Sequence, residues 1–275
     1  MRTILAYLFV ALTSLPALAS GGNETQGARA NSMAGTSVTL VDAWSTTNNP
    51  GALGLIDKFS FGMGYETRFF LPEASLRSVA MAAPLGGGTV GLVGHNYGFA
   101  GYSDNRVGLS YGRKLSEYIS LGVQVNYVQT RIGDVYGSRS TAVGEVGLLI
   151  MPSDHIRVGA HLYNPTRAKL ADFNDERIPT SLRIGGQYIF SDQVNASFEL
   201  DKDIDYPVNI KTGIEYQPVD QLFLRAGYAT AQNTLAFGFG YRWNGILADV
   251  SASWNQQLGY STTVSVGYEF GKRKK

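Results

Sequence analysis

From Lys58 to Phe270 the sequence repeatedly alternates between apolar residues and small or polar residues. In the stretch Ile119–Tyr127, for example, odd positions carry Ile, Leu, Val and Tyr, and even positions carry Ser, Gly, Gln and Asn. A period of two is that of a β-strand whose two faces meet different environments. Fourteen such segments can be recognised, at residues 58–69, 76–83, 89–97, 106–115, 119–132, 141–151, 156–164, 179–190, 194–203, 207–217, 222–229, 234–243, 246–255 and 260–270.

The segments have the length and the connections of a transmembrane β-barrel. Several contain about ten residues, enough to cross a bilayer at a tilt. Tight connections, such as Asn244-Gly245, alternate with longer ones, such as Gly133–Ser140 and Thr166–Ile178. A soluble β-sandwich or propeller is the alternative, but it would place charge on its solvent face. Here the charged face is also the glycine-rich face, and aromatic residues such as Tyr216 and Trp243 lie near segment ends on the other face. We therefore predict an all-β, antiparallel transmembrane barrel of about fourteen strands over residues 58–271, followed by a basic periplasmic tail at 272–275.

The N-terminus predicts export. Residues 1–19 combine Arg2, an apolar run from Ile4 to Leu15 and the small-residue cleavage pattern Ala17-Leu18-Ala19, as secretory signal peptides do. An uncleaved membrane anchor is the alternative, but the run is too short to span a bilayer. No later run of about eighteen apolar residues indicates a membrane helix. An exported barrel of this kind is expected in the outer membrane of a Gram-negative bacterium, in contact with its lipid.

Charge and cysteine content narrow the choice of partners. Without Arg2 the chain has 22 Lys+Arg and 22 Asp+Glu, so no nucleic-acid partner is expected. The chain has no cysteine, which excludes disulfide bonds and thiol chemistry.

Residues 20–57 are predicted to form a plug inside the barrel. A barrel of about eight strands is filled by its own side chains, whereas a larger one leaves a channel unless something occupies it. The segment is rich in small residues, and its apolar Val38, Leu40 and Trp44 argue against the alternative of a disordered leader outside the barrel. The residues expected to act in the plug are Arg29, Asp42, Trp44, Asn48, Asn49, Pro50 and Gly51.

The inward face is expected to carry charged pairs rather than a catalytic site. Counting across the hairpin turns places Glu215 opposite Arg225, Arg183 near Asp201, and Glu145 near His161. Cross-strand neighbours of opposite charge can form charge-assisted hydrogen bonds. The sequence has three histidines and no cluster with metal-ligand spacing. It has no Gly-x-Ser-x-Gly nucleophile elbow, because its one match to that pattern, at residues 108–112, lies inside an alternating segment. We therefore predict no catalytic residue, no metal and no cofactor, and the chain is not expected to be an enzyme.

The segment GARANSMAGTSVTLVDAWSTTNNPGALG, at residues 27–54, resembles the N-terminal signature of the FadL-like outer-membrane proteins. The matching positions are Gly27, Ala28, Arg29, Met33, Gly35, Asp42, Ala43, Asn49, Pro50, Gly51 and Leu53. Trp44 and the doubled asparagine are most similar to the PorV/PorQ-type branch. The resemblance implies a fourteen-stranded barrel with an N-terminal plug. The chain departs from the pattern in its short outer loops and in the basic tail after Phe270.

Two functions remain open from the sequence. The first is binding or passage of small hydrophobic molecules across the outer membrane, with a lateral opening where Gly91, Gly94 and Gly98 could bend a strand. The second, implied by the PorV/PorQ resemblance, is a non-transporting barrel that docks to proteins of a type IX secretion or surface-attachment complex. A diffusion porin ranks below both, because a plug and paired charges would block ion flow.

Overall fold

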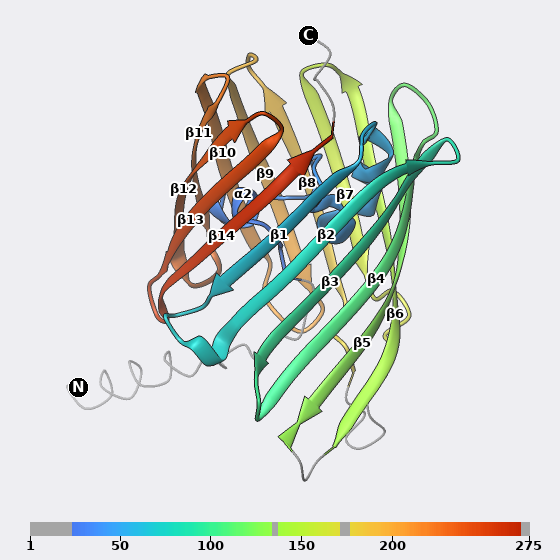
Figure 1. Cartoon of the computed structure of the whole chain (residues 1–275), viewed down its shortest axis with the longest axis vertical. Helices are drawn as coiled ribbons and strands as arrows, with labels where there is room; N and C mark the ends of the chain where they lie inside the picture. Colours follow the sequence, from blue (N-terminus) through green and yellow to red (C-terminus); the bar gives the residue numbers. More distant parts are fainter. Residues whose placement is uncertain (1–23, 134–136, 171–176, 271–275) are drawn as a thin grey trace, which may run out of the picture.

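A computed structural model describes residues 24–133, 137–170 and 177–270. The predicted signal peptide at 1–19, residues 20–23 of the predicted plug and the basic tail lie outside the described residues. Fourteen antiparallel strands form a closed barrel in which each strand pairs with the next and β1 pairs with β14 (Figure 1). The prediction of an all-β barrel of about fourteen strands is confirmed.

The strand bounds follow the alternating segments closely. The strands are β1 (Ser60–Thr67), β2 (Ser75–Leu85), β3 (Gly88–Phe99), β4 (Tyr102–Lys114), β5 (Ile119–Ile132), β6 (Ser138–Ser153), β7 (Ile156–Tyr163), β8 (Ser181–Ile189), β9 (Val194–Asp203), β10 (Asn209–Val219), β11 (Leu222–Ala229), β12 (Thr234–Trp243), β13 (Ile246–Asn255) and β14 (Gly259–Glu269). Several bounds differ from the sequence prediction; β4, for example, begins at Tyr102, four residues before the predicted segment. β6 begins at Ser138, inside the predicted loop, and Pro218 lies within β10 at a register shift between Tyr216 and Val219, where a residue without an N–H is tolerated.

The two ends of the barrel have different connections. At the turn end, short turns join the strands at residues 86–87, 115–118, 154–155, 190–193, 220–221 and 244–245. At the loop end, the connections include residues 68–74, and of the β7–β8 connection the described residues 164–170 and 177–180; η2 (Pro72–Ala74) and η4 (Ala231–Asn233) also lie there. In membrane barrels the end with short turns faces the periplasm and the end with longer loops faces outward.

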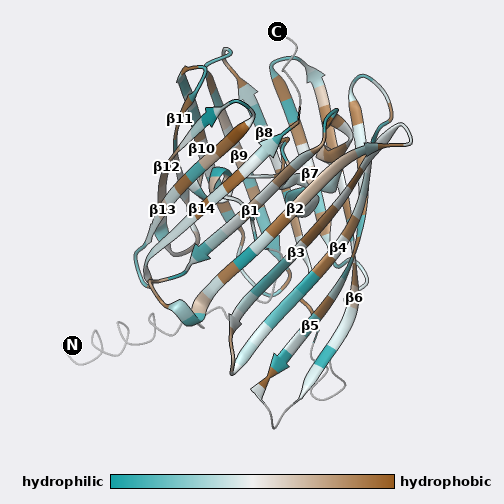
Figure 2. Cartoon of the chain, viewed as in Figure 1, coloured by the Kyte–Doolittle hydropathy of each residue, from teal (hydrophilic) through white to brown (hydrophobic). Residues whose placement is uncertain are grey.

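Outward-facing side chains are apolar and exposed. Val107, Leu109 and Val125 are 55%, 61% and 62% exposed, whereas Ser110 and Gln124, on the inward face of the same strands, are buried. Tyr216 and Trp243 are likewise exposed. Figure 2 shows apolar residues distributed along the strands of the wall. An apolar outer wall around a polar interior is the surface expected of a barrel that spans a membrane. Among the described residues, no helix is long and apolar enough to cross a membrane.

The N-terminal segment, residues 24–57, lies against the inward face of the wall (Figure 1). It contains α2 (Ala28–Ser32), α3 (Ser45–Asn48) and the 3-10 helix η1 (Pro50–Leu55). α2 packs against β11–β14 on one side, and η1 packs against β3–β6 on the other. The segment therefore crosses the interior and contacts both sides of the barrel.

Candidate functional site: the N-terminal segment and the inward wall

Trp44 occupies a slot made by glycines. Its side chain is buried beside Ala80, and Cβ atoms added at Gly62 and Gly64 of β1 would each lie 3.2 Å from the indole. Gly27 has φ +91° and its added Cβ would be 2.6 Å from the same ring. Because the inward residues of β1 are small, they leave the space in which this indole packs.

The Asn48-Asn49-Pro50-Gly51 sequence fixes the path of the segment. The Asn48 side chain donates to the Gln26 carbonyl and accepts from the Gln26 N–H, both at 2.9 Å. Asn49 accepts from the Gly51 N–H at 3.0 Å and thereby caps η1, in which Pro50 occupies an initial position. The Asn49 amide also donates to the carbonyls of Val38 and of Leu148 on β6. These bonds satisfy backbone groups that the irregular segment would otherwise bury unpaired.

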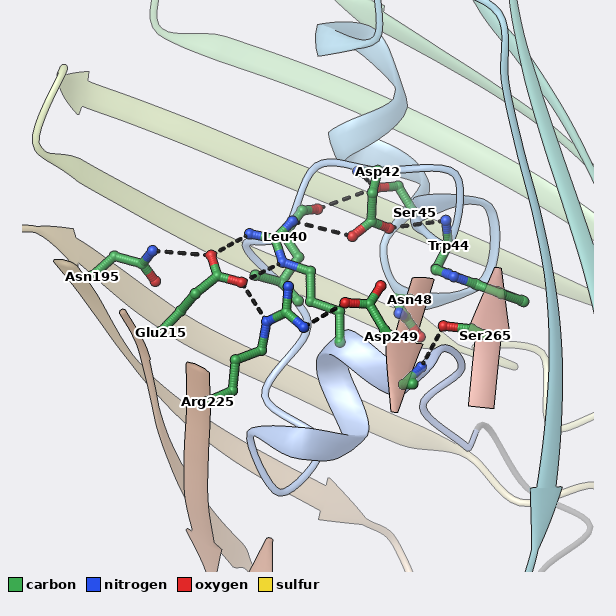
Figure 3. A network of polar contacts seen from close by, with 12 residues as sticks. Leu40, Asp42, Trp44, Ser45, Asn48, Asn195, Glu215, Arg225, Asp249 and Ser265 are labelled. Atoms are coloured by element: carbon green, nitrogen blue, oxygen red, sulfur yellow. Dashed lines mark hydrogen bonds and ion pairs between the residues drawn. The ribbon is translucent and has the colours of Figure 1, made fainter. Parts of the chain in front are cut away.

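Arg29 joins α2 to the charged wall, of which Figure 3 labels Glu215, Arg225 and Asp249. Its guanidinium donates through Nε and Nη2 to both oxygens of Glu215, at 2.9 and 2.7 Å, and lies 3.3 Å from Asp42. The structure brings Glu215 together with Arg225, its cross-strand partner, at 2.6 Å, and Arg225 also pairs with Asp249 at 2.6 Å. Two guanidinium groups and three carboxylates therefore form one buried network.

Burial changes the protonation equilibria within the segment. It raises the pKa of the Asp42 carboxyl, with the nearby Arg29 guanidinium acting in the opposite direction. Burial by itself would lower the pKa of Arg29, but the carboxylates of Glu215 and Asp42 outweigh it and raise that pKa. Arg29 is therefore a permanent cation that the wall carboxylates neutralise.

On the opposite side, Arg183 of β8 holds the segment. It donates to the Asn48 carbonyl at 3.0 Å and to Ser37 Oγ at 3.1 Å, and its Nη2 lies 2.7 Å from His161 Nδ1. Because a guanidinium only donates, Nδ1 of His161 must accept, and its proton is placed on Nε2, 2.8 Å from Glu145. Glu145, His161 and Arg183 thus form a buried chain over three neighbouring strands that ends on the segment.

The predicted proximity of Glu145 and His161 is seen in the structure. Glu145 lies opposite Tyr163 in the β6–β7 register, two positions from His161, and its carboxylate is 2.8 Å from His161 Nε2. The two side chains meet because diagonal neighbours are within reach.

Arg183 and Asp201 are direct cross-strand partners, yet the Arg183 guanidinium turns to the segment and Asp201 pairs with Lys211 at 2.7 Å. Counting residues across a hairpin predicts which residues face each other. It does not predict that a third element, here the N-terminal segment, binds one of the two side chains instead.

Some contacts of the segment and the wall were not predicted from the sequence. Glu199 accepts from the N–H groups of Ser37 and Val38 at 2.8 and 2.9 Å, and Glu24 forms an ion pair with Arg68 of the loop after β1. Arg106, only 2% exposed, lies over the ring of Tyr163 at 4.8 Å. The alternation of β4 places Arg106 on the inward face, so the pattern contained a signal for this residue. Nothing in the sequence points to Glu24.

A cavity of about 480 Å³ opens at the loop end, above the segment. Thr25, Asn31 and Gly35 of the segment border it. Its apolar and aromatic lining comes from Phe69, Tyr97, Pro179, Tyr206, Pro207 and Leu258, and its charged lining from Glu24, Glu66, Arg68, Asp201, Asp203 and Lys211. This loop-end cavity can hold a small molecule that has both an apolar body and polar groups.

The wall is closed at the glycines predicted to form an opening. β3 pairs with β2 and β4 without a register shift through Gly91 and Gly94. Gly91 faces inward, where an added Cβ would be 2.5 Å from Thr46 of the segment, and Gly98 has φ +103° near the end of the strand. Close packing against the segment accounts for Gly91, and a left-handed turn conformation accounts for Gly98.

Across the described ranges, no group of three or more His, Cys, Asp or Glu side chains could hold a metal ion.

Comparison with known proteins identifies the fold. No protein-family model and no curated protein sequence matches the chain. Among solved structures, the Ralstonia pickettii toluene transporter TbuX matches at 14% identity and a TM-score of 0.69, covering 90% of this chain and 99% of that one. The Pseudomonas putida toluene transporter TodX matches at 14% and 0.70, over 91% and 100% of the two chains. A Pseudomonas aeruginosa FadL homologue matches at 13% and 0.66, over 90% and 99%.

The chain has a FadL-like barrel fold. At these identities the similarity concerns the fold alone, and it covers nearly the whole length of each chain. The finer assignment to a PorV/PorQ-type branch, and with it the secretion role, finds no support in these structures.

Proposed function

We propose that this chain is an outer-membrane protein of a Gram-negative bacterium that binds small hydrophobic molecules and passes them across that membrane. The N-terminal segment acts as the plug. The observation that carries the proposal is the loop-end cavity, where aromatic and proline side chains lie directly over the segment. Two of the proteins of similar structure, TbuX and TodX, are toluene transporters, which supports the same class of ligand.

Passage requires the plug to move. Below the cavity the segment is bonded to the wall on both sides, through Arg29 to Glu215 and through Asn48 to Arg183. A hydrophobic molecule has no apolar path through such a network. The ligand is therefore expected to bind first in the cavity and to cross only when part of residues 24–57 rearranges.

The proposal is tested by cross-linking the plug to the barrel wall. Asn31 of α2 donates to Thr263 of β14 at 3.0 Å, and the chain has no cysteine of its own. The double variant Asn31→Cys with Thr263→Cys, treated with a short bismaleimide that alkylates both thiols, links the plug covalently to the wall. Toluene uptake is measured in cells that lack the gene and express either this variant or the unsubstituted chain. Cross-linking should abolish the protein-dependent uptake, whereas the two single variants treated with the same reagent should retain it.

A second candidate is a closed, non-transporting barrel that docks to a secretion or surface-attachment complex. The observation that favours it is the same network of buried ion pairs, which holds the segment in place. Toluene uptake that is identical in cells with and without the gene would remove the transport proposal. Co-purification of secretion-complex proteins with the full-length chain would then support this second candidate.

A further inference from the structure

A row of polar side chains crosses the lipid-facing surface near the loop end. In the strand pairing, Arg77 of β2 faces Asn96 of β3, Asn96 faces Asn105 of β4, and Asn105 faces Gln129 of β5. One step along the same outward face toward the turn end lie Val79, Val107 and Tyr127, which are 37%, 55% and 53% exposed. Amide and guanidinium groups are too costly to desolvate in the hydrocarbon core, so this row marks the depth of the lipid headgroups.

The internal hydrogen bonds of the row leave donors facing outward. Arg77 Nη1 donates to Asn96 Oδ1 at 3.1 Å, and Asn96 Nδ2 donates to Asn105 Oδ1 at 2.7 Å. The chain of bonds thus uses the carbonyl oxygens of both asparagines and leaves the remaining N–H groups of Arg77 and the Asn105 amide as donors. The Arg77 guanidinium is oriented further by the ring of Tyr65, 5.9 Å away.

The polar row borders a groove of about 390 Å³ on the outside of the barrel. Arg77, Asn96 and Ser103 contribute polar groups to it, and Pro72 and Phe99 contribute apolar surface. Glu73 is the one carboxylate among its described lining residues. Phe70 and Leu71, in the loop just before Pro72, are exposed at 61% and 52%.

We propose that this groove binds the phosphate of an outer-leaflet lipid. Arg77 and the neighbouring amides supply the donors that a phosphate accepts, and a planar guanidinium matches its geometry. The acyl chains of the same lipid would lie on the exposed Val79, Leu92 and Val107 of the adjoining apolar wall. A lipid satisfies both parts of the surface at once, whereas free phosphate satisfies only the donors. The occupant is therefore an anionic phospholipid or phosphorylated glycolipid.

The test measures lipid binding by the purified full-length protein in detergent. The probe is diphosphorylated lipid A, and dephosphorylated lipid A is the ligand control. Arg77→Gln should weaken binding of lipid A at least tenfold, whereas Glu73→Gln should strengthen it by removing repulsion. The matched protein control is Arg113→Gln, which removes an exposed arginine on β4 at the turn end and should leave binding unchanged. Each variant is checked for the heat-modifiable gel mobility of a folded barrel.

The outcomes separate the proposal from its alternatives. Equal affinity of the Arg77→Gln variant and the unsubstituted chain, or equal binding of both lipids, would overturn it. Full displacement of lipid A by an equal concentration of inorganic phosphate would also overturn it, because the apolar contacts would then contribute nothing. The measurement is independent of toluene uptake, so its result and that of the transport test do not depend on each other.

Discussion

At the scale of single residues, Arg183 decides how firmly the segment is held on the side of β6–β8. Replacing it by Met removes the donors to the Asn48 carbonyl and to His161 Nδ1. Each buried acceptor left without a partner costs about 1–3 kcal/mol. Hydrogen–deuterium exchange of residues 37–49 should therefore accelerate, while exchange in the strands away from β8 stays slow. Arg77→Met, which removes an exposed arginine of β2, is the matched control, and faster exchange in both variants would contradict the role of Arg183.

Trp44 provides a spectroscopic test at the same scale. The chain has three tryptophans, so replacing Trp243 and Trp254 by Phe leaves Trp44 as the reporter. Its buried indole should emit at short wavelength and resist quenching by acrylamide. In this background Gly62→Leu should raise the quenching severalfold, because the 3.2 Å gap between its added Cβ and the indole has no room for a larger side chain. Unchanged quenching would show that the indole does not occupy this slot.

Some of these residue contacts could be predicted and others could not. Glu215 and Arg225 follow from counting back across one hairpin, because a strand pair fixes which residues face each other. The partner of Arg183 does not follow from counting, since the segment brings a carbonyl from 135 positions away in the sequence. The alternation in the sequence predicts on which face of the strand a charged side chain lies, but not which of several nearby groups it binds.

At the scale of elements, η1 rests on a row of wall glycines. Gly112, Gly122 and Gly147 face one another across β4, β5 and β6, and a Cβ on any of them would overlap atoms of residues 49–54. Gly122→Val should therefore displace η1 at a cost of about 1–3 kcal/mol. Protease cleavage within residues 45–57 of the folded protein should become measurable. Gly144→Val is the matched control, because the space around that glycine of β6 is open; equal protease resistance of the two variants would contradict the seating of η1.

The elements differ in how well their sequence specifies them. The strands are each set by a local period of two, and their bounds mostly match the alternating segments. The glycine-rich inward face indicates crowding, but the sequence does not say that η1 seats on β4–β6 rather than elsewhere. That choice depends on the Asn49 and Pro50 contacts with β5 and β6, which lie far apart in the sequence. Helices as short as α2 and α3, with five and four residues, carry no periodic signal.

At the scale of the whole molecule, the barrel closes without help from the segment. The β1–β14 ladder continues over eight residue pairs, from Ser60–Glu269 to Thr67–Thr262. Because every strand has two neighbours, strand pairing runs around the whole wall without any strand from the segment. The segment adds contacts inside the wall but supplies no strand to it.

Removing residues 28–55 should therefore leave a folded barrel with an open interior. A fourteen-stranded wall is wider than its own side chains can fill, so the deletion variant should conduct ions in a planar bilayer, whereas the unsubstituted chain should conduct at least tenfold less. The wall charges released from the segment, Arg183, Glu199 and Glu215, are of both signs, so only weak ion selectivity is expected. Cleavage of the wall strands by protease would show that the segment is needed for folding. An intact but non-conducting variant would show that wall side chains, not the segment, close the barrel.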